Sequence, residues 1–373
     1  MPRLLNGASA VRENGISQEA AVNHAGKIDN QIGPHIHTHS GGVPRISVVM
    51  PAYNCAAFVE EATRSVLSQT FTDFELIIVD DGSTDGTCEI LKQFANEDSR
   101  IRLVCAEHQG LVAALNLGVS LARADLIARM DSDDVCLPNR FALQLEYLLA
   151  HPSAVAVGTN AEMIDPDGDP LGIVTPDFEP QELARKLIAG KSVKIWHPSV
   201  LLRKDILQNV GGYRAKYQHA EDFDLWLRMS EVGELHNLRE VLLLYRQHPG
   251  SICAQQRPAQ RLAVKAAVID AKRRRGLPQM EESIAQSKSQ KNSAKVTDAR
   301  ARWVRIAIRH GRPATARKHL RSLWKEKPWA IETWLALTSF ALCPWNLWGS
   351  TATSPSEEKQ AKSFSSNPLR RAA

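Results

Sequence analysis

The chain is poor in cysteine and lacks the patterns in which cysteines staple or target a protein. It has six cysteines in 373 residues, and no two of them are spaced Cys-x-x-Cys. The N-terminal stretch also lacks a continuous apolar segment followed by a small-residue cleavage site, so we expect no signal peptide. A chain of this length can bury a core that needs no disulfides. We therefore expect reduced, packed thiols in a cytoplasmic protein.

Long apolar runs and covalent nucleophile patterns are also missing. The most apolar stretch of the tail, residues 329–348, contains Glu332, Pro344 and Asn346, whereas a spanning helix needs about 20 mostly apolar residues. An interfacial helix with tryptophans at the headgroup level and a helix packed on its neighbours both remain open. No Ser-His-Asp or Cys-His pattern is evident, so no covalent enzyme intermediate is expected.

The net charge is small but unevenly distributed. It is +5 overall, and from Gln255 onward 24 Lys and Arg stand against 8 acidic residues. The rest of the chain is therefore distinctly acidic. Basic helical tails meet anionic membrane surfaces, nucleic acid or acidic partners, or are simply solvated. We expect no nucleic-acid partner, and peripheral contact with the inner face of a membrane remains open.

Apolar periodicity divides the chain into four segments. Residues 1–44 mix small and polar types without periodicity, which predicts a disordered leader, and residues 349–373 are expected to be a disordered tail. Residues 45–254 alternate short β runs with helical patterns, which predicts an α/β fold with a mainly parallel, doubly wound sheet. Residues 255–348 are predicted to form a basic helical extension that contains one tetratricopeptide-like hairpin. The predicted strands of the sheet are Ile46–Met50, Glu75–Val79, Ile101–Cys105, Leu126–Met130 and Ala154–Gly158, and a later strand is predicted at Val241–Tyr245.

Two adjacent carboxylates, Asp80 and Asp81, follow the second predicted strand. The carboxyl ends of parallel strands face the crevice in which open α/β proteins hold ligands. Ser83 or Thr84 is the better cap for the helix that follows, which leaves both carboxylates for a pocket. A purely structural role of this pair remains the alternative.

A second acidic group, Asp131, Asp133 and Asp134, follows the strand predicted at Leu126–Met130. Three acids within four residues repel one another unless a cation or donor offsets them. Magnesium and manganese take oxygen ligands from carboxylates and phosphates, so a divalent cation of this kind is implied. The alternative is an acidic loop that caps the helix beginning near Pro138.

Two further groups carry chemistry later in the chain. Glu221 and Asp222 open a predicted helix with an apolar face, and Asp222 is either its cap or a general base. Arg246 and His248 reach the same side of an extended segment and offer a cation and an imidazole to phosphate oxygens or a metal. A structural His248 remains open, and His197 is as readily a packed histidine as a substrate contact.

Together these residues resemble the family 2 glycosyltransferases, with their nucleotide-sugar-binding GT-A fold. The resemblance runs from about Arg45 to Ser251, so the leader and the basic tail lie outside it. It depends on the order and spacing of several moderately specific motifs. These are Pro51-Ala52-Tyr53-Asn54, Asp80-Asp81-Gly82-Ser83-Thr84-Asp85, the Asp131-Ser132-Asp133 "DxD", Gly211-Gly212-Tyr213, Glu221-Asp222 and Tyr245-Arg246-Gln247-His248.

The resemblance implies an inverting, hexosyltransferase-type reaction that depends on a metal. A sugar would pass from a nucleotide-diphosphate donor, a UDP-sugar above all, to a hydroxyl of a glycan or lipid-linked acceptor in polysaccharide or glycoconjugate biosynthesis. It implies a Mn²⁺ or Mg²⁺ ion on Asp133 and Asp131, with His248 as a candidate third ligand. It also implies Asp222 as the general base, with Glu221 positioning Asp222 or the acceptor.

The resemblance also implies a set of nucleotide-sugar-binding residues. Some would lie beneath the base or near the uracil, and others would reach the ribose, the ion or the phosphates. They are Pro51, Ala52, Tyr53, Asn54, Asp80, Asp81, Asp131 and Arg246.

Two other functions remain as alternatives. A sugar-phosphate nucleotidyltransferase shares the sheet and the paired acids, but it should carry a Gly-rich loop with Arg and Lys after the first strand. Here that loop is Pro51-Ala-Tyr-Asn-Cys55. A non-catalytic scaffold would instead recruit partners through the basic helical tail, although an inert sheet has no need of three acidic groups at one crevice.

Overall fold

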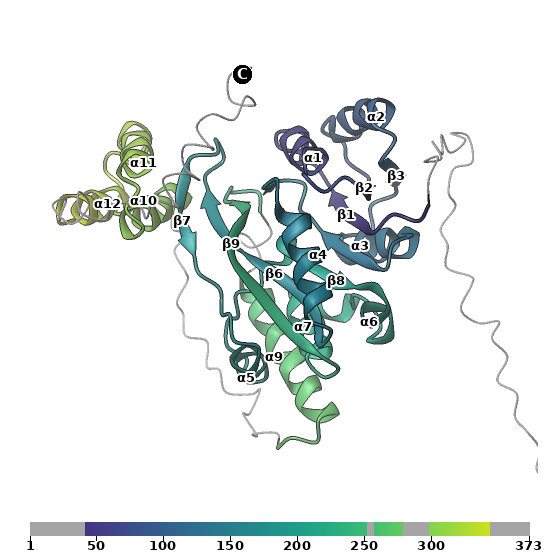
Figure 1. Ribbon diagram of the computed structural model, residues 1–373. Helices are drawn as coiled ribbons and strands as arrows, with labels where there is room; N and C mark the ends of the chain where they lie inside the picture. Colours follow the sequence, from purple (N-terminus) through teal and green to yellow (C-terminus); the bar gives the residue numbers. More distant parts are fainter. Residues whose placement is uncertain (1–41, 252–256, 279–297, 344–373) are drawn as a thin grey trace, which may run out of the picture. The chain divides into compact units, whose positions relative to one another are not determined.

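The structure is a computed structural model that describes residues 42–251, 257–278 and 298–343. The predicted disordered leader lies outside these residues except for 42–44, and the predicted disordered tail lies entirely outside them. The described strands join one nine-stranded sheet with the order β3-β2-β1-β4-β8-β6-β9-β5, and β7 pairs with β6. Figure 1 labels these elements along the chain.

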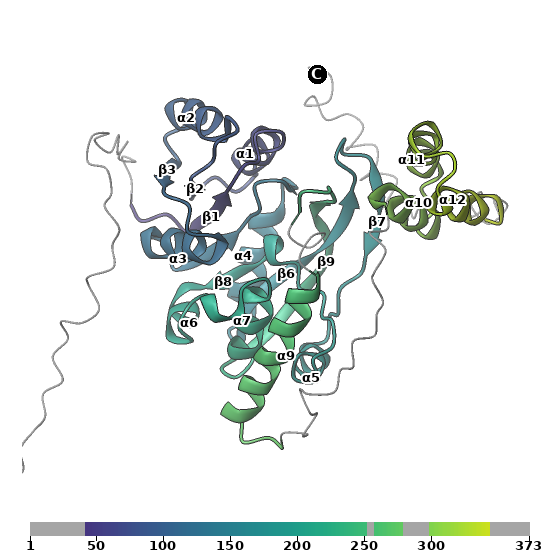
Figure 2. The same ribbon diagram turned by 180° about the vertical axis from the view of Figure 1, so that it is seen from behind.

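The first half of the sheet is parallel and has helices on both faces. β1 pairs with β2 and β4, and β2 pairs with β3, all in parallel. Helices α1 and α2 lie on one side and α3 on the other (Figures 1 and 2). This confirms the predicted α/β, doubly wound class. The elements are β1 (Ile46–Ala52), α1 (Val59–Leu67), β2 (Phe74–Asp81), α2 (Thr87–Glu97), β3 (Ile101–Ala106), α3 (Leu111–Leu121) and β4 (Leu126–Arg129).

The second half of the sheet mixes directions. β8 pairs antiparallel with β4 and β6, and β6 runs parallel to β9. Its elements are β5 (Val135–Cys136), α4 (Arg140–Ala150), β6 (Ala154–Ile164), β7 (Pro170–Val174), α5 (Pro180–Ile188), β8 (Leu201–Arg203), α6 (Lys204–Asn209), α7 (Glu221–Met229) and β9 (Glu234–Arg246).

Strand β9 begins seven residues before its predicted start at Val241. Polar side chains interrupt the apolar pattern of its first half, and the structure buries them with partners. His236 Nδ1 lies 2.9 Å from the hydroxyl of Tyr147, and Asn237 donates to the carbonyl of Asp177 at 2.8 Å. Apolar periodicity therefore detected only the second half of the strand.

Strand β2 sends alternate side chains to opposite faces of the sheet. Leu76 and Ile78 join the apolar cluster that α1 and α2 cover, whereas Ile77 and Val79 join the cluster beneath α3. Burying each such side chain contributes about 1.5–3 kcal/mol. The same alternation points the next two residues of β2, both aspartates, to opposite faces.

A glycine allows α3 to lie close to β1. A Cβ atom on Gly118 would lie 2.5 Å from Cγ1 of Val49, which is shorter than any normal contact between carbon atoms. Val79 of β2 also borders this position, at 3.5 Å. Close-packed interiors do not absorb an extra methyl group without moving. The distance between α3 and the sheet therefore depends on the missing side chain.

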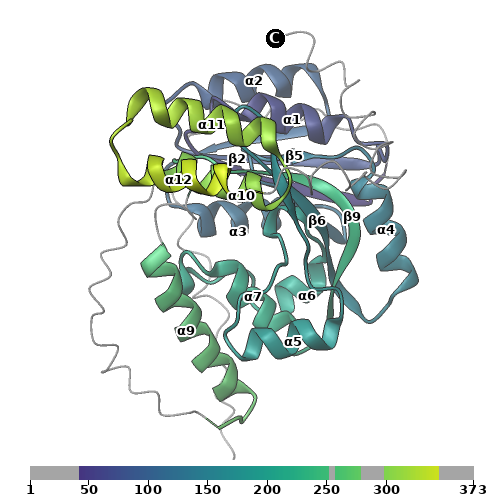
Figure 3. The same ribbon diagram turned by 90° about the vertical axis from the view of Figure 1, so that its left-hand side faces the viewer.

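Among the described residues, four helices follow the sheet: α9 (Arg257–Arg274), α10 (Ala299–Arg309), α11 (Pro313–Glu326) and α12 (Ile331–Ala341). Helix α9 packs on α7, and Figure 3 shows α10, α11 and α12 side by side. Helix α10 buries Trp303 against Met163 and Leu171 of the β6–β7 hairpin. In the described part of the chain, no helix combines the length and apolarity needed to cross a bilayer.

The turn between β6 and β7 holds α11 through charge. Gly168 N donates to the carbonyl of Asp165 at 3.0 Å and closes this turn. Lys318 of α11 lies 2.7, 2.6 and 2.7 Å from carboxylate oxygens of Asp165, Asp167 and Asp169. A lysine ammonium therefore occupies the centre of this acidic turn.

Candidate active site

The loops after β1 and β2 are tied to each other by side chains. The Oδ1 of Asn54, whose φ of 46° lies in the left-handed region, accepts from Thr84 N at 2.8 Å. Asn54 N donates to Ser83 Oγ at 2.9 Å. The prediction that Ser83 or Thr84 caps α2 is therefore wrong, because both residues hold Asn54 instead. Asp85 accepts from the amide of Thr87, the first residue of the helix, at 3.1 Å.

Asp81 joins β2 to the start of α3. Its two carboxylate oxygens accept from the backbone amides of Gln109 and Gly110 at 2.8 and 2.9 Å. His108 Nδ1 lies 2.9 Å from the same carboxylate. Tyr53, which is 48% exposed, stacks on the ring of His108 with centroids 4.2 Å apart. A flat aromatic surface and a carboxylate thus lie together at the carboxyl ends of β1 and β2.

The second acidic group forms a tight cluster after β4. Asp131, Asp133 and Asp134 each place one carboxylate oxygen within 4.8 Å of the others. Burial, followed by the charges of Asp133 and Asp131, raises the pKa of Asp134 well above its usual range. Among the described residues, Oδ2 of Asp134 is buried without a hydrogen-bond partner. These three carboxylates offer hard oxygen ligands and need positive charge nearby. Mg²⁺ and Mn²⁺ suit such a group.

His248 extends this cluster from the end of β9. Its Nε2 lies 2.9 Å from Oδ2 of Asp133, and its ring packs on Phe58 with centroids 4.9 Å apart. Cys55 extends the cluster toward the β1 loop, because its thiol shares hydrogen bonds with Ser132 and Thr87. Burial raises the pKa of Cys55 to about 11. The acidic cluster, the β1 loop and the end of β9 are therefore in direct contact.

Arg246, at the end of β9, is held by contacts within the protein. It is buried, and its guanidinium donates to the carbonyls of Asp133, Asp165 and Pro166 at 2.8, 3.3 and 3.0 Å. It also donates to Glu61 at 2.5 Å. Both Arg246 and His248 contact Asp133 and Phe58, so the two side chains lie on the same side as expected, and the carbonyls hold the guanidinium inside the protein. Arg246 thereby fixes the acidic loop to the β6–β7 turn.

The pair Glu221 and Asp222 forms another wall of the site, in the first turn of α7. Burial, followed by the charge of Asp222, raises the pKa of Glu221 to about 7. Burial also raises the pKa of Asp222. The charge of Asp222 acts in turn on Asp131, whose pKa is raised mainly by burial. Asp131, in the loop after β4, and the two acids of α7 therefore lie in one poorly solvated region.

Arg129, at the end of β4, supplies positive charge between these acids. It is 3% exposed, it forms an ion pair with Asp131, and its charge lowers the pKa values of Glu221 and Asp222 against burial. Its Nε and Nη1 have no hydrogen-bond partner within the described ranges. None of the sequence motifs includes this residue. A single arginine between Ala128 and Met130 of a buried strand was the available signal.

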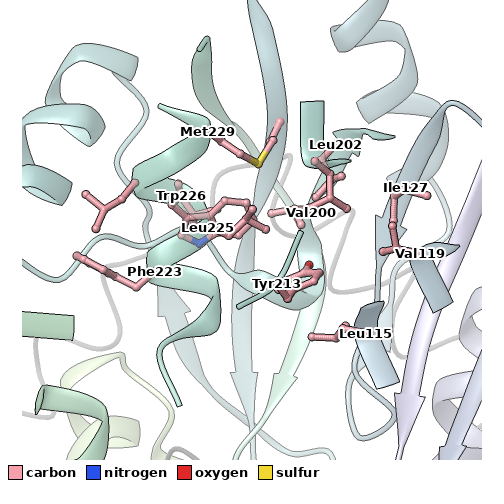
Figure 4. Close-up of a cluster of buried hydrophobic side chains, with 14 of the residues drawn as sticks. Leu115, Val119, Ile127, Val200, Leu202, Tyr213, Phe223, Leu225, Trp226 and Met229 are labelled. Atoms are coloured by element: carbon pink, nitrogen blue, oxygen red, sulfur yellow. The ribbon is translucent and has the colours of Figure 1, made fainter. Parts of the chain in front are cut away.

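An apolar cluster fixes the orientation of α7. Figure 4 shows Trp226 of this helix between Phe223 on one side and Tyr213, Val200 and Leu202 on the other. His197 Nε2 lies 2.8 Å from the hydroxyl of Tyr213, and burial lowers the pKa of His197 well below its usual value. Of the two roles left open for His197, the packed histidine is the one observed.

Comparisons with known proteins identify the family of this chain. The family described as glycosyl transferase family 2 matches residues 47–211. The glycosyltransferase EpsE of Bacillus subtilis, whose function is itself putative, is 37% identical over 210 residues, which are 55% of this chain and 73% of EpsE. The chain belongs to glycosyl transferase family 2.

Other similar proteins are larger or more distant. Hyaluronan synthase of Pasteurella multocida is 30% identical over 244 residues, which cover 62% of this chain but only 24% of that protein. The chain thus spans about a quarter of that relative's length. A crystal structure of S. aureus TarS residues 1–349 with UDP-GlcNAc superposes with a TM-score of 0.50 at 16% identity, covering 74% of this chain and 88% of TarS. That likeness supports the GT-A fold.

The family 2 match contains only part of the site. It includes the residues around Asn54, Asp81 and Asp133, but it ends at residue 211, before Glu221 and His248. The later residues join the site through the contacts described above.

Proposed function

We propose that the chain is a nucleotide-sugar-dependent, inverting glycosyltransferase with a glycan or lipid-linked acceptor. Two contacts of the acidic cluster carry this proposal. Asp133 contacts His248, and the charge of Asp222 acts on Asp131. A cluster suited to a divalent cation and a carboxylate suited to a proton are then adjacent. Family membership supports the same reaction class.

In this proposal Asp131, Asp133 and His248 hold Mn²⁺ or Mg²⁺, with Asp134 behind them. The chain's residues fit such an ion because the acids are crowded, their charge is incompletely offset and Asp134 keeps an unpartnered buried oxygen. When bound, the ion would stabilise the charge that develops on a departing diphosphate.

Asp222 would accept the proton of the acceptor hydroxyl as that hydroxyl attacks the anomeric carbon. Its raised pKa suits a base that works near neutral pH, because a more basic carboxylate accepts a proton more readily. Glu221 would orient the acceptor or Asp222. The positive charge of Arg129 would keep Asp222 sufficiently ionised to accept the proton. Attack on the face opposite the leaving group inverts the configuration, so an α-linked donor would yield a β-linked product.

The donor's base would lie against the loops after β1 and β2. Tyr53 and His108 offer a stacked aromatic surface, and Asp81 is a hydrogen-bond acceptor beside it. Pro51 to Asn54 would form the floor of this part of the site. We propose a UDP-sugar as the donor, since a planar pyrimidine with an N–H group matches an aromatic ring beside a carboxylate.

Helices α11 and α12 would bring the enzyme to an anionic membrane surface. Arg317, Arg321 and Trp324 follow one another at helical spacing along α11, and Trp324 contacts Trp334 of α12 edge-to-face at 5.7 Å. Trp329 is 87% exposed beside them. Tryptophan with arginine is typical of protein surfaces at lipid headgroups. Sedimentation with anionic vesicles, weakened by salt and by Trp329→Ser, is the expected result.

The experiment that tests the main proposal measures nucleotide release. Purified protein is incubated with UDP- and GDP-sugars and a glycan acceptor, with Mn²⁺ or with a chelator. We expect acceptor-dependent UDP release that the chelator abolishes. Release of pyrophosphate from a nucleoside triphosphate and a sugar phosphate would instead identify a nucleotidyltransferase.

A further inference from the structure

Two cysteines and one aspartate meet beneath the first turn of α2. Cys88 is the second residue of that helix, and Cys105 is the penultimate residue of β3. Their sulfur atoms are 3.0 Å apart. Asp80 of β2 is the register partner of Cys105, so the two side chains leave the sheet on the same side. This group is separate from Asp131, Asp133 and Asp134.

The carboxylate in this group needs a positively charged or donating partner. One oxygen of Asp80 and the two sulfurs all lie within 4.8 Å of one another. Asp80 is 2% exposed, and its Oδ1 has no hydrogen-bond partner in the described part of the chain. Leaving a buried charged oxygen unsatisfied is costly. The ammonium of Lys92 forms a hydrogen bond with Cys88, and the charge of Cys88 is the main cause that raises the pKa of Lys92. Among the described residues, neither Lys92 nor any other group donates to Oδ1 of Asp80.

We propose that Asp80, Cys88 and Cys105 bind a thiophilic divalent cation of the zinc class. Thiolates select Zn²⁺ over Mg²⁺ and Mn²⁺, and two sulfurs with one carboxylate oxygen leave the fourth tetrahedral position for water. Both thiols bind as thiolates, so binding releases two protons to solvent. With Zn–S bonds of about 2.3 Å the sulfurs would be about 3.8 Å apart, so they must separate by less than about 1 Å.

An ion at this position would act on the neighbouring loop. Residues 82–86 connect β2 to α2 and carry Ser83 and Thr84, which hold Asn54. A bond from α2 to both β2 and β3 fixes the two ends of that loop. We expect the ion to change the affinity for a nucleotide sugar, a consequence that depends on the proposed function, whereas metal binding itself does not.

The test titrates the reduced, full-length protein with Cd²⁺, a zinc-class ion whose thiolate complexes absorb ultraviolet light, in excess Mg²⁺. We expect one thiolate-bound Cd²⁺ per chain, displaced by Zn²⁺. Cys88→Ser and Cys105→Ser should each abolish the absorbance, and Asp80→Asn should weaken binding at least about tenfold. Cys343→Ser is the matched control and should bind normally. Absorbance that persists in both serine variants would overturn the proposal.

A second measurement uses only the wild-type chain, in case a variant does not fold. Iodoacetamide labels the protein with and without Zn²⁺, and peptide mass spectrometry reads each cysteine. Protection of Cys88 and Cys105, but not of Cys343, is the expected result. Equal labelling with and without Zn²⁺ would contradict the site. It would also be contradicted if the reduced protein took up no Cd²⁺, although a small-molecule disulfide could oxidise Cys88 and Cys105 to a disulfide.

Discussion

His248 Nε2 lies 2.9 Å from Oδ2 of Asp133, although 115 residues separate them in the chain. The contact joins the end of β9 to the loop after β4, so the two halves of the sheet both contribute to one cluster. This contact supports the proposed role of His248 as a neighbouring ligand of the ion that Asp133 would hold.

Asp133→Ala is expected to weaken Mn²⁺ binding at least about tenfold, because it removes one hard ligand and the anchor of His248. Isothermal titration with Mn²⁺ measures the loss, and UDP binding that depends on Mn²⁺ should fall with it. Asp73→Ala, at an exposed acid before β2, is the control and should bind normally. Unchanged Mn²⁺ affinity in Asp133→Ala would remove the metal site from the proposal.

Asp222→Asn is expected to lower the rate of sugar transfer by about 10²- to 10⁴-fold, the usual contribution of a general base. Because the amide cannot accept the proton but has the same shape, binding of UDP should hardly change. Steady-state release of UDP and equilibrium binding separate the two effects. A variant that transfers sugar at the wild-type rate shows that another group takes the proton.

Glu221 should make the protein less stable as the pH rises. Its pKa in the folded protein is about 7, above the ordinary value of 4.5, so the folded state binds more protons between these values. Stability from this group is full below about pH 4.5 and is lost as the pH rises toward 7. Glu221→Gln should therefore be more stable than wild type at pH 8, by up to about 3 kcal/mol.

Urea unfolding at pH 5 and pH 8 measures this difference. Glu97→Gln, at an exposed glutamate near the end of α2, is the control and should follow the wild-type pH dependence. A Glu221→Gln variant with the same pH dependence as wild type would show that Glu221 ionises normally. Asp131, Asp134 and Asp222 have raised pKa values as well, so part of the slope should remain in Glu221→Gln.

Arg129→Met is expected to destabilise the protein by about 3–5 kcal/mol, because it leaves Asp131 without its buried counter-charge. Added Mn²⁺ should then raise the melting temperature more in the variant than in wild type, since the ion replaces the missing charge. Arg129→Lys keeps the charge and should lose less. Thermal unfolding with and without Mn²⁺ gives both numbers, and an undiminished melting temperature in Arg129→Met would refute the role.

Lys318 should control the acid stability of the helices beyond the sheet. Burial opposes ionisation of Asp165, but hydrogen bonds from His319 and Lys318 outweigh it and lower the pKa of Asp165 to about 2. This stability is present above the ordinary value of 3.8 and is lost as the pH falls toward 2. Lys318→Met should release α10 and α11 at a higher pH, seen in the fluorescence of buried Trp303. Arg309→Met is the control, and an identical acid transition would disprove the role.

Periodicity and motif spacing predicted much of the parallel half of the sheet, from β1 to β4. The strands around Ile46 and Glu75 were found because both faces of a parallel sheet are buried, which yields continuous apolar runs. The acids at 80, 81, 131 and 133 were found because each pair ends such a strand. Local patterns of this kind are visible along the chain without any tertiary contact.

The remainder depends on contacts between distant residues. The partners of Arg246 could not be predicted, because the carbonyls that surround its guanidinium come from two loops far away in the sequence. Arg129 was missed because its charge matters only once α7 is folded beside β4. The cap of α2 was assigned to Ser83 or Thr84 because local rules could not show that Asn54 takes their hydrogen bonds.

Gly118 has an influence that reaches the opposite end of its helix. Eight residues, about 12 Å along α3, separate it from Gly110, whose amide holds Asp81. Any side chain at 118 would overlap Val49, so α3 would have to move away from the sheet. We expect this movement to displace the backbone amides at the start of α3 from the carboxylate of Asp81. The geometry of the corner where we propose that the base binds is thus set by an absent methyl group in the core.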